Sequence, residues 1–330
     1  MAVESLSFWS DRALSAVPQS RYPAARRNTQ LSSAPNGAFL LRLFPDRELL
    51  KLPWQDVLGK FIAKRRAPKV RALYDAVGGG SPILKWTRAQ GDGMCARLDV
   101  LSPESAPHRF YVAVRYAPPF ADDALLAMHA DGIERAVAFT QYPQWSCTTT
   151  GSSLNDLWRA LSRQGLEVAF EWSVLDRWGD DDGFVRSVAG AIRDGLEQYA
   201  PHERDEVLLL YSAHSLPLSV IDRADAYPAE VAPIAFTSDH IETLSEIDIE
   251  YAHLASSLGM TGFRRAPSLN ARPAFLDALA GLVSAHLDQQ TPHSTQYRSH
   301  CPGCSNAACR SLPANVVQSH ASSADVIAAV

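Results

Sequence analysis

Four short stretches of the chain are almost entirely apolar, β-branched or aromatic. The expected strands are Phe110–Tyr116, Ala136–Thr140, Val207–Tyr211 and Ile234–Thr237. Helical patterns separate most of them, and the expected helices are Asp122–Asp131, Ser152–Arg163, Phe184–Tyr199 and Ile241–Leu258. Strands of near-continuous hydrophobicity that alternate with helices are typical of a parallel sheet covered on both faces. The pattern therefore predicts an α/β protein.

A polar cluster follows each expected strand. The clusters are Arg115-Tyr116, Gln141-Tyr142, Ser212-Ala213-His214 and Ser238-Asp239-His240. In open α/β sheets, ligands bind beyond the carboxyl ends of the strands. We therefore expect the four clusters to converge on one site.

Two of these clusters contain a histidine. The imidazole of His214 would titrate near neutral pH, which suits a general base or a metal ligand. His240 and Glu242 lie two residues apart and do not share a helix face, but an extended turn would let both face the cleft of His214. Ser238 or Asp239 can cap the helix that follows. Such imidazoles and carboxylates would either bind a divalent ion transiently or carry protons away from a substrate.

The stretch from Phe39 to Val70 alternates apolar and basic residues in a broken helical stripe. Its last basic residues are Lys64, Arg65, Arg66 and Lys69. A helix of this kind either lies in a membrane interface or roofs an apolar pocket. The alternative is an amphipathic helix that packs on a sheet.

Three consecutive glycines precede Ser81 and Pro82. Serine is a favoured N-cap and proline a favoured first helical residue, so we expect a helix from here towards Arg97. A helix N-terminus behind a glycine turn can hold an anion on its free N–H groups. The turn matches neither the GxGxxG pattern of dinucleotide-binding proteins nor a P-loop, so it is only a weak indication of nucleotide binding.

The chain has 330 residues, of which 46% are hydrophobic and 20% charged, and its formal net charge is −5. These values describe an ordinary soluble globular protein of two domains or one large α/β unit. The mild acidity argues against a nucleic-acid binder, because there is no basic excess to neutralise phosphates. No uncharged apolar run approaches the ~20 residues of a membrane-spanning helix.

The five cysteines are unevenly placed, at Cys95, Cys147, Cys301, Cys304 and Cys309. This distribution favours a metal site in a reducing compartment over a disulfide framework. Zinc would take a fourth ligand such as His300 or His293. An iron–sulfur cluster would instead need a fourth thiolate, from Cys147 or Cys95. The spacing alone leaves the metal open.

Six longer segments are similar to one family. They are FIAKRRAPKV, YDAVGGGSPI, AFTQYPQWSCTTTGSSLN, YSAHSLPLSVIDRADAYP, PIAFTSDHIETLSEIDIEY and CPGCSNAACR. Together they make the chain resemble a eukaryotic ferrochelatase of the [2Fe–2S] type over about Asn36–Arg310. The resemblance implies a lyase that inserts Fe²⁺ into protoporphyrin IX to form haem. It also implies two Rossmann-like, chelatase-type halves, each a parallel sheet flanked by helices.

The resemblance further implies residue roles. His214 would accept pyrrole protons or bind the metal, and Glu242, Asp239 and His240 would line an acidic path. Porphyrin contacts would come from Arg65, Arg66, Tyr74, Ser81, Arg115, Tyr116 and Tyr142. Guanidinium groups suit propionates because they donate two parallel hydrogen bonds. The [2Fe–2S] ligands would be Cys147, Cys301, Cys304 and Cys309.

Organisation and location follow from the same resemblance. The first residues contain arginine and serine but few acids, as in a transit peptide or a disordered tail. We expect residues 1–36 to be such a segment, 37–165 a first α/β domain with a membrane-facing lip, 166–290 a second α/β domain, and 291–330 an iron–sulfur-binding extension. The protein would be a homodimer bound peripherally to the matrix side of the mitochondrial inner membrane.

Two departures from the family stand out. The apolar strand that begins the first domain in the family is missing, since Pro35-Asn36-Gly37 leads directly into FLLRLF. The second half is shortened near residues 232/233, where the family has a piece at least the size of a βαβ unit, roughly 30 residues or more. A shortened, non-catalytic chain that retains an iron–sulfur cluster is therefore the alternative function.

Overall fold

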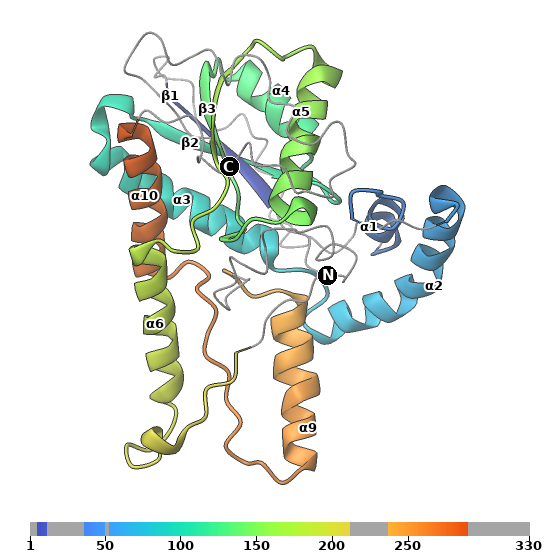
Figure 1. The fold of residues 1–330 in the computed structure, drawn as a ribbon, viewed down its shortest axis with the longest axis vertical. Coiled ribbons are helices and arrows are strands. Elements are labelled where there is room, and N and C mark those ends of the chain that lie inside the picture. Colours follow the sequence, from blue (N-terminus) through green and yellow to red (C-terminus); the bar gives the residue numbers. More distant parts are fainter. Residues whose placement is uncertain (1–4, 12–35, 50–52, 212–236, 290–330) are drawn as a thin grey trace.

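The computed structural model describes residues 5–11, 36–49, 53–211 and 237–289 (Figure 1). The strands are β1 (Ser5–Asp11), β2 (His108–Val114), β3 (Arg135–Phe139) and β4 (Glu171–Leu175). The α-helices are α1 (Asn36–Leu43), α2 (Gln55–Ala76), α3 (Ile83–Leu101), α4 (Ala121–Ala130), α5 (Ser152–Gln164), α6 (Asp182–Leu196), α9 (Ala252–Ser257) and α10 (Pro273–Asp288). Two further helices, η2 (Cys147–Gly151) and η4 (Glu242–Tyr251), are π-helical, and η1 (Pro103–Ser105) and η3 (Arg204–Glu206) are short 3₁₀ turns.

The strands form two pairs. β3 and β4 run parallel, with Arg135 opposite Glu171 and Phe139 opposite Leu175. β1 and β2 run antiparallel, with Ser5 opposite Val114. β1 also lies beside β3, so the two pairs follow one another across the middle of the molecule (Figure 1).

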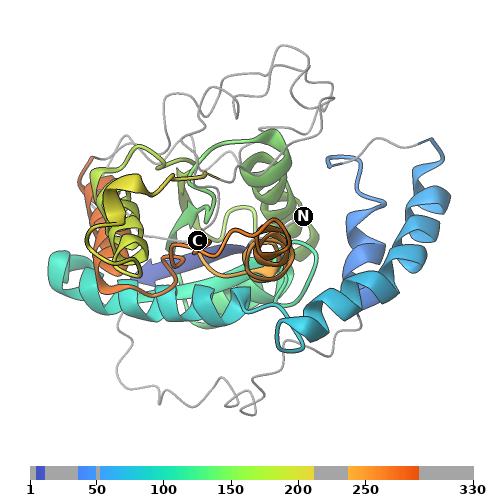
Figure 2. The same cartoon turned by 90° about the horizontal axis from the view of Figure 1, so that it is seen from below.

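Alternation along β3 divides the core between two faces. Ala136 and Ala138 belong to the cluster formed with α4 and α5. Val137 and Phe139 belong to the cluster formed with α3, α6 and α10. Successive strand side chains point to opposite faces, so a fully apolar strand such as β3 requires a cover on both sides. Seen from below, α3 and α5 lie on opposite sides of β1 (Figure 2).

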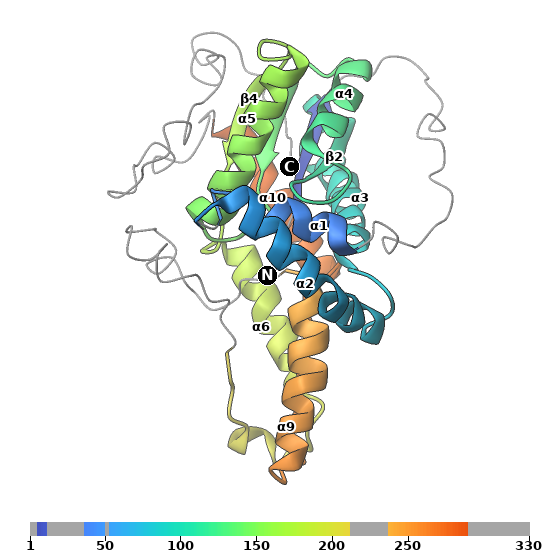
Figure 3. The same cartoon turned by 90° about the vertical axis from the view of Figure 1, so that its right-hand side faces the viewer.

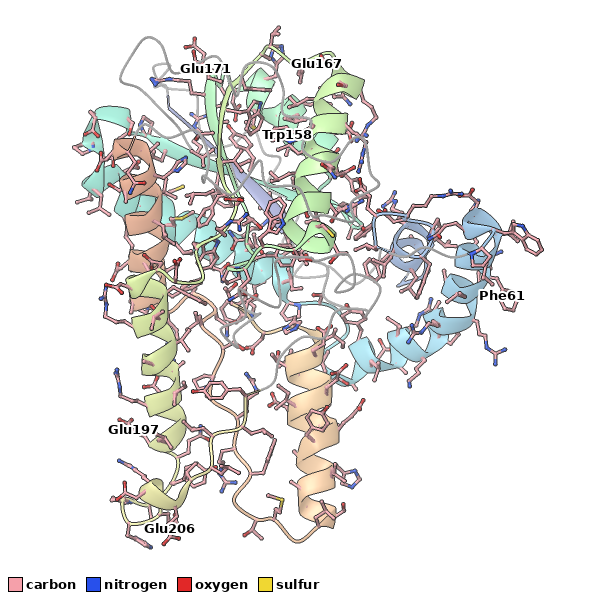
Figure 4. The ribbon with its side chains drawn as sticks, in the orientation of Figure 1. Phe61, Trp158, Glu167, Glu171, Glu197 and Glu206 are labelled. Carbon is pink, nitrogen blue, oxygen red and sulfur yellow. The ribbon has the colours of Figure 1, made fainter. Side chains whose placement is uncertain are left out.

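Three helical arms extend from this body. α6 and the continuous rod of η4 and α9 extend in the same direction (Figures 1 and 3). α2 projects sideways and carries Phe61 on its outer side (Figure 4). Among the described residues, no helix is long and apolar enough to cross a membrane.

Most of the expected architecture is confirmed. The expected helices correspond to α4, α5, α6 and the η4–α9 rod, and two expected strands correspond to β2 and β3. The α/β class with a parallel pair and covering helices is confirmed as well.

The strand expected at Val207–Tyr211 is wrong. This segment has no regular structure, and Leu208 and Leu210 are 88% and 85% exposed. A run of β-forming residues becomes a strand only where it can pair with a neighbouring strand and pack on a core. No described strand pairs with this segment. The expected strand over 234–236 lies outside the described residues.

Two observed strands were not expected. β4 pairs with β3 although it lies beyond the expected domain boundary after residue 165, and its first residue is the charged Glu171. β1 falls in the stretch that we expected to lie outside the fold. The sequence of β1, SLSFWSD, begins with serine and apolar residues in alternation, which is the period of a strand.

Candidate active site

A buried ion pair marks the site. His240 follows the segment Thr237–Asp239, and Glu242 is the first residue of η4. The Nε2 atom of His240 lies 2.7 Å from Oε2 of Glu242, and the two residues are 1% and 9% exposed. The two-residue spacing therefore brings the side chains together through the bend that leads into the helix, as the sequence suggested.

The surroundings of this pair orient the ring of His240 and lower the proton affinity of Glu242. Nδ1 of His240 lies 3.1 Å from the carbonyl oxygen of Ser238, and a carbonyl only accepts, so Nδ1 is the donor of this hydrogen bond. Burial raises the pKa of Glu242, but the interaction with His240 acts in the other direction, and overall this pKa lies below its ordinary value. Glu242 is therefore a carboxylate at neutral pH.

Acidic residues continue from this pair to the surface along η4. Glu246 and Glu250 follow Glu242 at intervals of four residues and are exposed. Burial raises the pKa of Glu246, and the charges of Glu242 and Glu250 raise it further. The proton affinity of Glu246 is therefore higher than that of Glu242. Glu246 and Glu250 were not among the residues predicted from the sequence, although their four-residue spacing after Glu242 is visible in ETLSEIDIEY.

Tyr74 of α2 is coupled to the same pair. Burial, and then the charge of Glu242, raise the pKa of the Tyr74 phenol to about 12. The phenol thus stays protonated over the physiological range and is available as a hydrogen-bond donor. α2 and η4, which are far apart in sequence, contribute to one site.

The carboxylate of Asp239 is fully engaged by neighbouring residues. Its Oδ2 atom accepts from Nδ2 of Asn270 at 2.9 Å. Its Oδ1 atom accepts from Oγ of Ser268 at 2.7 Å and from Nη1 of Arg265 at 3.2 Å. Burial raises the pKa of Asp239, but these hydrogen bonds and the charge of Arg265 lower it overall. Asp239 therefore acts as an anchor for the segment before His240.

Arg115 and Tyr116, which follow β2, point into a buried network and not into open solvent. Nη2 of Arg115 donates to Oδ2 of Asp46 at 2.6 Å and also contacts Glu48. The Tyr116 hydroxyl donates to the same Asp46 oxygen at 2.9 Å. Arg159 of α5 binds Glu48 from the other side, at 2.9 Å. The network ties the segment after α1 to β2 and α5.

The other expected porphyrin contacts lie on α2, at the start of α3 and after β3. Arg65 and Arg66 are exposed on α2. Ser81 is half-buried, and its hydroxyl accepts a hydrogen bond from the N–H of Ile83 at 3.4 Å, at the start of α3. Tyr142 is half-buried after β3, close enough to raise the pKa of Tyr116.

The remaining expected residues are divided between described and undescribed parts of the chain. His214 lies outside the described residues, as do Cys301, Cys304 and Cys309. Cys147 is the first residue of η2 and is half-buried. Within the part of the chain that the structure describes, no group of three or more histidine, cysteine, aspartate or glutamate side chains is arranged to hold a metal ion.

Comparison with known proteins identifies the family. The protein-family model of ferrochelatase matches residues 32–232 and 229–287. The chain belongs to the ferrochelatase family. The mitochondrial ferrochelatase of Bos taurus is 44% identical over 325 residues, covering 82% of this chain and 78% of that protein. The enzyme of Gallus gallus is 43% identical over 329 residues (84% and 82%), and that of Dictyostelium discoideum is 41% identical over 350 residues (83% and 83%).

Membership of the ferrochelatase family confirms the expected chelatase-type fold and the enzyme class, a lyase of haem synthesis. The structure brings His240, Glu242 and Tyr74 of this ferrochelatase-family chain into one electrostatically coupled group. Arg115 and Tyr116 lie together in a second group, near Tyr142. Asn270, which organises the segment before His240, was missed because a single asparagine after a loop has no sequence signal of its own.

Proposed function

We propose that this chain inserts Fe²⁺ into protoporphyrin IX to form protohaem, the last step of haem synthesis, and that His240 and Glu242 handle the displaced protons. The observation that carries the proposal is the buried pair of His240 and Glu242, with an acidic line leading from it to the surface. A helix N-terminus needs only a serine or aspartate cap for its stability. A buried histidine–glutamate pair at this place therefore favours a role in chemistry.

The chemistry requires a route for two protons. Each pyrrole N–H proton that leaves the macrocycle must be accepted as Fe²⁺ binds the ring nitrogens. Glu242 is a weak resting base because its interaction with His240 lowers its pKa, whereas the pKa of Glu246 is raised. A proton accepted at Glu242 is therefore passed outward to a carboxylate of higher proton affinity. His214 is proposed as the first acceptor or as a metal ligand on the sequence resemblance.

Substrate binding is assigned to residues on three elements. The exposed guanidinium groups of Arg65 and Arg66 suit the propionates of the porphyrin. Tyr74, Ser81 and Tyr142 would contact the ring. The polar atoms of Arg115 and Tyr116 already bind the carboxylate of Asp46. These two residues would therefore support the porphyrin pocket as part of its wall and would not bind the porphyrin directly. A wall made rigid in this way helps to hold a distorted, more easily metallated macrocycle.

A [2Fe–2S] cluster fits the donor set. Four thiolates are the usual ligands of such a cluster, and the half-buried Cys147 is not enclosed in the core. Cys301, Cys304 and Cys309 would supply the other three. When bound, the cluster would join the C-terminal extension to η2 through iron–thiolate bonds.

The location follows from α2 and from the relatives. Trp54, Val57 and Phe61 are 88%, 74% and 62% exposed on this arm, next to its basic residues. Exposed aromatic and apolar side chains flanked by lysine and arginine suit a membrane interface. We therefore propose a homodimer bound peripherally to the mitochondrial inner membrane, on its matrix side.

A second function has two observations in its favour. The ferrochelatase model matches in two pieces that meet at residues 229–232, which supports a missing internal segment. The exposed run at Leu208–Leu210 also suits a strand that lacks its neighbour. On this alternative, the chain is non-catalytic and retains only the iron–sulfur cluster.

The two functions are separated by measuring metal insertion. Purified protein is mixed with protoporphyrin and Fe²⁺ or Zn²⁺, and the loss of porphyrin fluorescence is followed. We expect turnover in the wild type, a loss of about 10²-fold or more in His240→Gln, and no change in His253→Gln, an exposed histidine of α9. A folded protein whose visible spectrum shows the cluster but which does not metallate porphyrin would establish the alternative.

A further inference from the structure

Asn270 has an unusual backbone conformation. It lies between α9 and α10, three residues before α10 begins, and its φ angle is +48°. Left-handed backbone is uncommon outside glycine, and asparagine is one of the few residues that tolerate it. A residue held in this region needs compensating interactions.

Four hydrogen bonds offset the cost of the left-handed backbone conformation of Asn270. Its N–H donates to the carbonyl oxygen of Thr237 at 2.8 Å. Its side-chain Oδ1 accepts from the N–H of Asp239 at 2.8 Å, while its Nδ2 donates to Oδ2 of Asp239 at 2.9 Å. Its carbonyl oxygen accepts from Nε2 of Gln90, a buried residue of α3, at 2.8 Å. Asn270 therefore fastens the segment before His240 to the helix on the sheet.

The opposite side of Asp239 is fastened as well. Arg265 binds Asp239 through Nη1, and it donates to Asp248 of η4 through Nε at 2.6 Å and Nη2 at 2.9 Å. Burial lowers the pKa of Arg265, but its carboxylate partners raise it overall. The segment Thr237–Asp239 is thus fixed both to α3 and to the middle of η4.

We propose that Asn270 is a positioning residue that sets the geometry of the His240–Glu242 pair. His240 follows the clamped Asp239 directly, and its ring is aimed by the carbonyl of Ser238, inside the clamped segment. A displacement of this segment would separate the imidazole from Glu242, whose own position is set by η4. The catalytic part of this inference rests on the proposed function, whereas the structural part does not.

Two variants test the clamp. Asn270→Gly keeps the left-handed backbone available and removes both side-chain hydrogen bonds to Asp239. Asn270→Asp keeps an acceptor for the Asp239 N–H but loses the donor to its carboxylate. The control is Gln198→Ala. This change removes an exposed 3.4 Å hydrogen bond to the carbonyl of Arg265, in the same loop, and leaves the hydrogen bonds of the segment Thr237–Asp239 in place.

We expect kcat for metal insertion to fall about tenfold or more in Asn270→Gly, with KM for porphyrin changed by less than about twofold. Asn270→Asp should give an intermediate loss, and Gln198→Ala none. A purely structural role would lower the thermal midpoint and the folded fraction without this division between kcat and KM. That result would overturn the proposal.

A measurement without turnover separates the clamp from the proposed function. The ring N–H shared by His240 and Glu242 should give a far-downfield proton resonance, assigned by its loss in His240→Gln. We expect it to shift or exchange away in Asn270→Gly and to persist in Gln198→Ala. A resonance unchanged in Asn270→Gly would refute the clamp whether or not the protein metallates porphyrin. If Asn270→Gly does not fold, Asn270→Asp decides by the same criteria.

Discussion

The body around the sheet and the arms formed by α6 and η4–α9 differ sharply in how they bury their apolar residues. In the body, Leu125, Leu157 and Leu161 have no exposed surface. On the arms and the segments next to them, Leu208, Leu254 and Leu258 are 88%, 54% and 69% exposed. The sheet region therefore has a complete core, whereas the second region is stabilised mainly at its junction with the first.

The site lies at that junction. Only the first turn of η4 is buried, at Glu242, Thr243 and Ser245. The segment Thr237–Asp239 that leads into this turn is held by hydrogen bonds through Asn270 from Gln90 of α3. The comparison indicates that the acid–base pair takes its rigidity from the body, although its residues belong to the arm. Each of the following predictions tests that division.

The largest effect on stability is expected in the body, at Trp172→Ala. Trp172 is 1% exposed and packs edge-on against Trp158, with ring centroids 5.4 Å apart. Truncation of a buried tryptophan leaves a cavity and should cost about 3–5 kcal/mol of unfolding free energy. Urea denaturation measures this cost. A loss below about 1 kcal/mol would mean that the core is not closed around this ring.

A smaller loss of unfolding free energy is expected at the buried network that ties the segment after α1 to the body. Glu48→Gln removes the charge that binds both Arg115 and Arg159. Asp46 still pairs with Arg115, so we expect a cost of about 2 kcal/mol rather than that of a fully broken buried pair. Thermal unfolding measures it. Asp182→Asn, which removes the exposed partner of Arg186 on α6, is the matched control and should change little.

A pH-dependent effect is expected at the junction. The pKa of Glu242 is lowered to about 2 in the folded protein, so its contribution to stability is complete above the unfolded pKa of ~4.3 and is lost as the pH falls towards 2. Denaturation at a series of pH values should show this slope, and Glu242→Gln should flatten it. An unchanged slope in the variant would assign the acid sensitivity to other carboxylates, such as Asp239 or Asp122.

The smallest effect is expected on the exposed segment. Leu208→Ser should change the unfolding free energy by less than about 0.5 kcal/mol, because the side chain is already in solvent. Its aggregation rate should fall, since an exposed apolar run promotes association. Static light scattering together with denaturation measures both. A large destabilisation would show that this leucine is buried in solution.

Local patterns predicted much of the fold. Strong apolar runs that alternate with helical patterns predicted β2, β3 and the helices around them. The apolar runs are clear because helices cover both faces of the sheet. Val207–Tyr211 shows the limit of this reasoning, since its composition is that of a buried strand but no described strand receives it. β4 was missed because its sequence, EWSVL, is short and its apolar residues are interrupted by Ser173 and preceded by Glu171.

The site was partly predictable for a similar reason. The proximity of His240 to Glu242 follows from a bend between neighbours, so the sequence contained it. The partnership of Asp239 with Asn270, and of Arg115 with Asp46 and Glu48, depends on segments that meet only in the folded chain. Such contacts have no spacing that a sequence pattern can detect.

The uneven burial of η4 has a consequence for how this region opens. Amide hydrogens near Tyr251 lie on an exposed part of the helix, whereas those near Glu242 lie on its buried first turn, next to the hydrogen-bonded segment Thr237–Asp239. Fraying should therefore begin at the far tip of the rod and travel inward, and deuterium uptake should follow that order. The first turn would be the last part of this arm to lose its order.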